Sequence, residues 1–383
     1  MRLRTGGHVK SLDGLRAFAV LSVLAYHLDF IQPARSSLLH PHGGYLGVDV
    51  FFALSGYLIT TLLIAEWDRR NHIKFRGFYA RRALRLYPAM LVLLLVVGLL
   101  CAHWSAFWWA PKTIGVIPWV LTYSANWGVA LHGSNVWAGT LANTWSLAVE
   151  EQFYLVWPVI CLVLLKVVRR RGVLAVGCLA AAGLEMWWRW HLAAHGASYT
   201  RLYNATDTHS DGLLIGCALA FFLATIPPLT DRDARWRHLA RAAGLCGAAA
   251  GVWLYLYANE GPHWLWYVPA TAAATALLLG SLLTYPVPIV ERVLEFAPLQ
   301  WVGKRSYGLY LWHLSVIVMA SSLGPWSWKT PTPAYRASLV AVSLAVTAVS
   351  YTLVERPFLK LKGRLSALRD SRAAGGASLA AAA

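Results

Sequence analysis

The chain has 383 residues, of which 58% are hydrophobic and only 13% are charged. Soluble domains carry about 25% charged residues, so this composition excludes a soluble enzyme and predicts an all-α integral membrane protein. The formal net charge of +17 raises the question of a nucleic-acid partner, and the position of the basic residues along the chain decides it.

A helix needs about 20 mostly apolar residues to cross the hydrocarbon core of a bilayer. We expect about ten transmembrane helices, at residues 12–31, 45–66, 86–103, 146–165, 172–192, 209–226, 242–257, 264–284, 307–323 and 335–354. An even number of spans puts both termini on one side, which we assign to the cytoplasm. Residues 1–362 then form one membrane domain, and the low-complexity residues 363–383 are predicted to be a disordered cytoplasmic tail.

The basic residues follow the loops of this arrangement. Of the 34 Lys and Arg residues, 27 fall on the cytoplasmic side and 6 on the outer side. This is the positive-inside distribution of membrane proteins, so it explains the net charge and argues against nucleic-acid binding. Counting the apolar stretch 113–130 as an eleventh span would move the basic residues 166–171 outside, so we interpret that stretch as re-entrant or packed on the outer side.

No residue pattern predicts a metal site. The cysteines lie in apolar segments without paired spacing, which argues against both a disulfide framework and zinc. They are Cys101, Cys161, Cys178, Cys217 and Cys246.

The first apolar segment carries Arg16 and His27. Eleven residues make about three helical turns, so the two side chains share a face and lie about 16 Å apart along the axis. Ionisable residues inside a membrane are costly and usually functional; Asp13, three residues before Arg16, is placed to orient the guanidinium. Histidine is well suited to accept a hydroxyl proton near neutral pH. Taken alone, Arg16 and His27 fit equally well as residues that lie at the inner and outer membrane interfaces and have no catalytic role.

An arginine cluster, Arg81, Arg82 and Arg85, precedes the third apolar segment. Arg81 and Arg85 are four residues apart and share a helical face. Clustered arginines bind phosphates through bidentate hydrogen bonds. The alternative is a cytoplasmic cluster that contacts anionic lipid headgroups.

Two adjacent carboxylates, Glu150 and Glu151, begin the fourth segment. Neighbouring helical residues diverge by about 100°, so at most one of them is expected to face His27 and stabilise its imidazolium. The alternative is that Glu150 and Glu151 lie at the N-terminus of a helix, where the helix dipole favours negative side chains. Asp49 lies inside the second segment, and Asp211 lies near the start of the sixth.

Together these motifs resemble the membrane-bound acyltransferase-3 family, which includes bacterial glycan O-acetylases and macrolide O-acyltransferases. The resemblance runs from about Ser11 to Pro357. The matching strings, in chain order, are Ser11–Arg16 with His27, Gly47–Gly56, Arg81–Arg85, Trp145–Tyr154, Ser306–His313 and Glu355–Pro357.

The resemblance implies an enzyme that uses cytoplasmic acyl-CoA, usually acetyl-CoA, to acylate a hydroxyl on the outer side of a bacterial cytoplasmic membrane. Acyl-CoA is then a substrate, and no permanently bound cofactor is expected. His27 would be the catalytic histidine, supported by Glu151 or Glu150. Arg16, Arg81, Arg82 and Arg85 would engage the CoA. Supporting or substrate roles would fall to Asp13, Asp49, Asp211, Tyr307 and His313.

One string departs from the family pattern, and the acceptor stays open. The family often has Arg-x-Asp where this chain has His209-Ser210-Asp211; Arg201 is a candidate substitute for that arginine. No hydrolase-like domain is seen after the membrane domain, which leaves room for a small secreted acceptor such as a macrolide as well as a glycan. The sequence also leaves open whether His27 acts as a general base or carries the acyl group. A glycan or polyanion transporter is the alternative from another class, although no repeated halves are evident.

Overall fold

The computed structural model describes residues 9–29, 42–226, 234–261, 263–323 and 332–361. Within these ranges the secondary structure is helical and contains no strand, which confirms the all-α prediction. The segment 363–383, predicted to be a disordered tail, lies outside the described residues. The long helices are α1 (Lys10–Asp29), α2 (Gly47–Arg70), α3 (Phe75–His103), α6 (Thr144–Val167), α7 (Arg171–Ala194), α10 (Ala234–Tyr257), α11 (Trp264–Leu283), α14 (Ser306–Leu323) and α15 (Pro333–Ser350).

Shorter helices connect and cover these. They are η1 (His42–Leu46), α4 (Trp109–Leu121), α5 (Ala125–His132), η2 (Asn135–Leu141), α8 (Tyr199–Asn204), α9 (Asp211–Leu223), α12 (Pro288–Leu294), α13 (Ala297–Gly303) and the π-helical turn η3 (Tyr351–Glu355). Helices satisfy every backbone hydrogen bond within one segment, which a hydrocarbon environment demands.

Among the described residues, six helices are long and apolar enough to cross a membrane. They are His42–Arg70, Phe75–His103, Thr144–Val167, Ala234–Tyr257, Trp264–Leu283 and Pro333–Leu361. Each coincides with one of the predicted spans. The other four predicted spans correspond to α1, α7, α9 and α14, which are helical but not among the six. Thus a multi-pass membrane protein is supported, while ten spans and cytoplasmic termini stay predictions.

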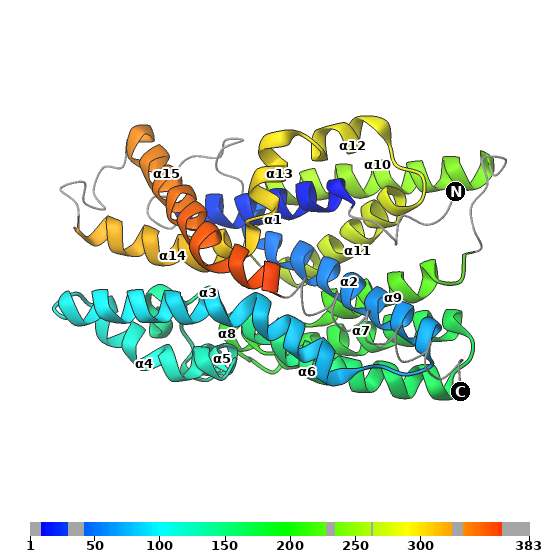
Figure 1. The fold of residues 1–383 in the computed structure, drawn as a ribbon, viewed down its shortest axis with the longest axis horizontal. Coiled ribbons are helices and arrows are strands. Elements are labelled where there is room, and N and C mark those ends of the chain that lie inside the picture. Colours follow the sequence, from blue (N-terminus) through cyan, green and yellow to red (C-terminus); the bar gives the residue numbers. More distant parts are fainter. Residues whose placement is uncertain (1–8, 30–41, 227–233, 262, 324–331, 362–383) are drawn as a thin grey trace, which may run out of the picture.

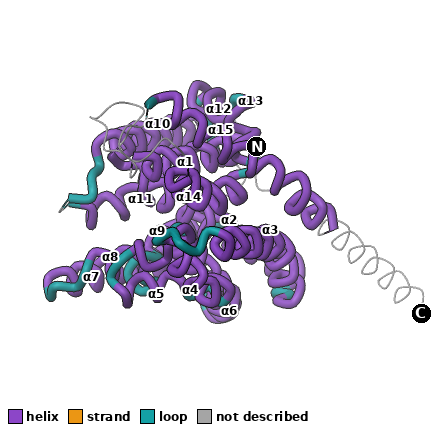
Figure 2. Tube along the Cα trace, turned by 90° about the vertical axis from the view of Figure 1, so that its left-hand side faces the viewer, coloured by secondary structure: helices purple, strands orange, loops and turns teal. Residues whose placement is uncertain are grey.

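The helices form two layers with α2 between them (Figure 1). One layer holds α1 and α10 to α15, and the other holds α3 to α9. The view turned by 90° shows the same separation (Figure 2). The two halves of the chain are interleaved, because α1 packs against α13 and α14 from the C-terminal part. This brings the Arg16 and His27 helix to the interior of the molecule.

Glycines let α2 approach α9 closely. A Cβ atom at Gly56 would lie 1.9 Å from the carbonyl oxygen of Leu213, and one at Gly216 would lie 2.2 Å from that of Ala53. Small residues at such contacts are typical of helix pairs in membranes. The close approach brings the buried Asp49 on α2 next to the residues that precede α9.

Candidate active site

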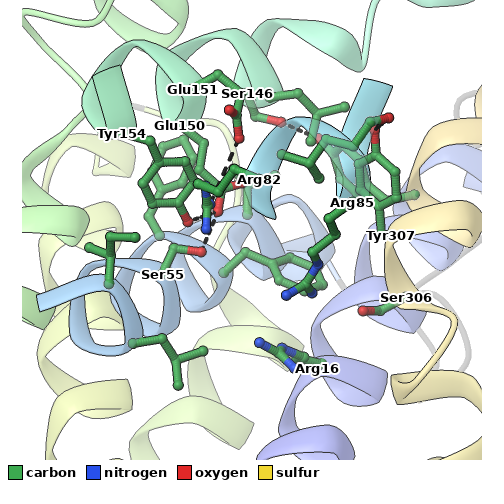
Figure 3. A pocket seen from close by; sticks show the side chains of 18 of the residues that line it. Arg16, Ser55, Arg82, Arg85, Ser146, Glu150, Glu151, Tyr154, Ser306 and Tyr307 are labelled. Atoms are coloured by element: carbon green, nitrogen blue, oxygen red, sulfur yellow. Dashed lines mark hydrogen bonds and ion pairs between the residues drawn. The ribbon is translucent and has the colours of Figure 1, made fainter. Parts of the chain in front are cut away.

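The first cavity, about 230 Å³ in volume, gathers three arginines and two glutamates. Arg16 enters it from α1, whereas Arg82 and Arg85 enter from α3. Figure 3 shows the guanidinium groups of Arg16 and Arg85 pointing into the same space. We call this the arginine cavity. Several guanidinium groups around one space favour a ligand that carries phosphates.

The two glutamates tie the walls of the arginine cavity together (Figure 3). Glu150 accepts hydrogen bonds from the hydroxyls of Ser55 on α2 and Tyr154 one turn along α6. Glu151 lies 3.8 Å from the guanidinium of Arg82. The same guanidinium stacks over the Tyr154 ring, with 3.2 Å between its carbon and the ring centroid. Helices α2, α3 and α6 are therefore held by one polar network.

Two further contacts fix the other side of this cavity. Arg16 lies 3.6 Å from Asp13, the pair that the three-residue spacing predicts. The Tyr307 hydroxyl donates to the Leu86 carbonyl at 2.8 Å and so joins α14 to α3.

The second cavity, about 450 Å³ in volume, contains His27. We call it the histidine cavity. The carboxylate of Glu260 lines it and accepts a hydrogen bond from the Tyr26 hydroxyl. The tyrosine and tryptophan side chains in the wall are Tyr26, Tyr45, Trp108, Trp145, Tyr199, Tyr203 and Tyr310. An apolar, aromatic wall with a few placed polar groups is the usual character of a small-molecule site.

A second histidine sets the tautomer of His27. His313 on α14 is fully buried, and its Nδ1 donates to the Leu309 carbonyl at 3.0 Å. Its Nε2 is then the acceptor, 3.1 Å from Nδ1 of His27. His27 Nδ1 also lies 2.9 Å from the Val23 carbonyl, which can only accept. Nδ1 of His27 therefore carries the proton and Nε2 carries the lone pair, as a general base requires.

A buried ionic network lies behind the histidine cavity. His209 Nε2 is 2.8 Å from Asp49, and its Nδ1 donates to the Tyr203 carbonyl. Nδ1 of His209 therefore carries a proton, and Nε2 shares a second proton with the Asp49 carboxyl. Its ring stacks on Trp145, with centroids 5.4 Å apart. His209 thus supports two residues of the cavity wall, Trp145 and Tyr203.

The second pair of this network is Arg189 with Asp211, both fully buried. Arg189 on α7 lies 2.9 Å from one carboxylate oxygen of Asp211 and 3.2 Å from the other. It also donates to the Thr208 carbonyl at 2.8 Å. This bidentate geometry holds α7 to the start of α9.

Comparison with known proteins settles the family. A family model described as an acyltransferase domain matches residues 9–354. The chain belongs to the acyltransferase-3 family.

Several curated relatives cover nearly all of the chain. OatA of Listeria monocytogenes, named a peptidoglycan O-acetyltransferase, is 32% identical over 366 residues, or 92% of this chain and 56% of the relative. A Bacillus subtilis protein, provisionally named the peptidoglycan O-acetyltransferase YrhL, is 32% identical over 369 residues, or 91% of this chain and 55% of the relative. A Staphylococcus aureus protein, provisionally named an O-acetyltransferase, is 32% identical over 368 residues, or 92% of this chain and 58% of the relative. The chain thus spans little more than half the length of these relatives, and no solved structure matches it.

The acyltransferase-3 motifs divide between the two cavities. Arg16 and His27, which belong to one motif, line the arginine and histidine cavities respectively. Of the arginine motif, Arg82 and Arg85 line the arginine cavity, whereas Arg81 is not among its lining residues. Arg82 and Arg85 are three residues apart, a spacing that also places two side chains on one helical face. That face, and not the one shared by Arg81 and Arg85, borders the cavity.

The expected support of His27 by a neighbouring carboxylate takes a different form. Glu150 and Glu151 lie in the arginine cavity, where hydroxyl donors and Arg82 hold them. Asp13 lies beside Arg16, and Asp49 is bound to His209. Each of these four carboxylates is bound to another residue, and the ring beside His27 is that of His313.

Other residues at the site were not predicted from the sequence. Arg189, not Arg201, binds Asp211; Arg201 lies 2.6 Å from Asp207 on the outside of the same region. An arginine inside the apolar segment 172–192 was a signal that would have identified it. Glu260 and Tyr310 gave no such signal, because only tertiary contact brings them to the cavities. Among the described residues, no group of three or more His, Cys, Asp or Glu side chains could hold a metal ion.

Proposed function

We propose that this protein transfers an acyl group, most readily acetyl, from acyl-CoA to a hydroxyl of a glycan at a bacterial cytoplasmic membrane. One observation carries the proposal. Helix α1 presents Arg16 to the arginine cavity and His27 to the histidine cavity, about 16 Å apart along the helix axis. A donor and an acceptor thus have separate places on one helix.

The arginine cavity is the proposed donor site. CoA carries several phosphates, and Arg16, Arg82 and Arg85 supply the bidentate donors that suit them. Glu151 holds Arg82 in place at the cavity wall. The distribution of Lys and Arg, 27 of 34 on the predicted cytoplasmic side, favours an opening of this cavity toward the cytoplasm, where acyl-CoA is made.

The histidine cavity is the proposed acceptor site. Its tyrosine and tryptophan rings offer flat apolar faces for sugar rings, and Glu260 and Tyr26 offer hydrogen bonds. The names of the relatives refer to peptidoglycan O-acetylation, which supports a glycan acceptor. A small hydroxylated molecule would use the same groups.

His27 would act as the general base. Its Nε2 lone pair takes the proton of the acceptor hydroxyl while that oxygen attacks the thioester carbonyl. The carbon–sulfur bond then breaks, the CoA thiolate leaves, and the His27 imidazolium returns the proton to the sulfur. The acyl group remains on the acceptor as an ester, and His313 keeps Nδ1 of His27 protonated throughout.

The test uses labelled acetyl-CoA and membranes that contain the protein. We expect base-labile label in the glycan fraction, absent from matched membranes that lack the protein. Arg85→Gln removes a charged hydrogen-bond partner worth about 1.5–3 kcal/mol, so we expect the KM for acetyl-CoA to rise about tenfold to a hundredfold. Arg81→Gln, on the same helix but outside the cavity lining, should change KM less. Absence of any ester would contradict the proposed function, and equal effects of the two variants would contradict the donor site.

A further inference from the structure

One side chain, Tyr310, lies between the two cavities. Tyr310 and Val48 line both the arginine cavity and the histidine cavity. The Tyr310 ring has Phe51, a wall residue of the arginine cavity, on one side at 6.1 Å and His313 on another at 5.6 Å, between ring centroids. Only 5% of Tyr310 is exposed.

The phenol hydroxyl of Tyr310 is bonded to one residue of each cavity. It lies 3.1 Å from the Asn143 backbone carbonyl, which can only accept, and Asn143 lines the histidine cavity. It is also hydrogen-bonded to the Ser146 hydroxyl, with either oxygen able to donate, and Ser146 lines the arginine cavity. The side-chain amide of Asn143 in turn donates to the backbone carbonyl of Tyr310. The ring is therefore anchored at both its hydroxyl and its backbone to the start of α6.

We propose that Tyr310 is the partition between the two cavities and that it limits the size of the acyl group that passes from one to the other. The proposal rests on the proposed function for the direction of transfer. The two cavities share Tyr310 and Val48 as wall residues, so an acyl group bound with its donor at Arg16 passes beside this ring on its way to His27. Because the ring is buried and anchored at two points, it leaves little space for a passing group. Acetyl needs less space than any longer acyl group.

The partition is tested first without any reaction. Ser55→Cys puts a thiol in the arginine cavity, in a chain that also carries Cys246→Ser because Cys246 is the exposed native cysteine. Sealed vesicles are treated from one face or the other with a small membrane-impermeant methanethiosulfonate. We expect labelling from one face with Tyr310 or Tyr310→Phe, and from both faces with Tyr310→Ala or the milder Tyr310→Leu.

Tyr307→Leu is the matched control, because Tyr307 lies one turn earlier on α14 and lines only the arginine cavity. It should leave labelling confined to one face. Labelling from both faces while Tyr310 is present would overturn the partition, as would one-sided labelling in folded Tyr310→Leu.

The size limit is tested with acetyl-CoA and butyryl-CoA. One extra methylene group in a tight apolar site is worth about 10-fold or more in rate, so we expect Tyr310→Leu to raise the butyryl-to-acetyl rate ratio by at least about that factor. Tyr310→Phe and Tyr307→Leu should leave the ratio within about twofold of the natural protein, since neither removes the ring at position 310. An unchanged ratio in Tyr310→Leu would overturn the size limit. If the natural protein forms no ester from either donor, the proposed function fails, and the labelling result still decides the partition.

Discussion

Replacing His27 by alanine is expected to lower kcat by about 10²- to 10⁴-fold, the usual contribution of a positioned general base. The KM for the donor should change little, because the arginine cavity lies at the other end of α1. The structural reason is the tautomer: Val23 and His313 hold the proton on Nδ1 of His27 and leave the lone pair on Nε2. Ester formation from labelled acetyl-CoA, at matched protein levels, measures the effect.

His103→Ala is the control for this experiment. His103 is the last residue of α3, is exposed, and lines neither cavity. We expect it to keep the natural rate. A well-expressed, folded His27→Ala protein with natural kcat would remove His27 from the chemistry.

The largest loss of stability is expected from breaking the Arg189–Asp211 pair. Arg189→Met leaves the Asp211 carboxylate buried without its charged partner, which costs about 3–5 kcal/mol for buried ion pairs. The helices that the pair joins, α7 and α9, lose their bidentate link, so the acceptor side of the bundle should loosen first. Thermal unfolding of the purified protein in detergent, followed by the monodisperse fraction, measures the change.

Two variants sharpen this prediction. Arg201→Met breaks an Arg–Asp pair in the same region whose side chains are 25% and 39% exposed, and such pairs contribute about 0–1 kcal/mol. The double variant Arg189→Met with Asp211→Leu removes both buried charges and should recover part of the loss. Equal unfolding temperatures for Arg189→Met and Arg201→Met would contradict the structural role of the buried pair.

Much of the fold could be predicted from hydropathy. The six strongly apolar helices are where the sequence places them. The other four helices carry the functional polar groups or are short, as with the 13-residue α9. The hydropathy of α1, α7, α9 and α14 is therefore a weak guide to whether these helices cross the membrane. Helix α9 packs closely against α2 at Gly56 and Gly216. The hydropathy of either helix alone does not reveal this contact.

The candidate site was only partly predictable. Local spacing predicted the Asp13–Arg16 contact and the shared face of Arg16 and His27. The partners of Glu150 and Glu151 were not predicted, because Ser55 and Arg82 come from other helices. Likewise, the two contacts of His209, with Asp49 and with the Tyr203 carbonyl, were not predicted, because both partners come from other parts of the chain. Such contacts depend on which helices become neighbours.

The division into two cavities implies that an acyl group enters beside Arg16 and leaves beside His27. Sealed vesicles containing the protein test it most directly, with labelled acetyl-CoA supplied outside only and soluble peptidoglycan fragments supplied either inside or outside. We expect base-labile label on fragments trapped inside, and little on fragments that share the outer solution with the donor. Label that appears only when donor and fragments are on the same side would contradict it.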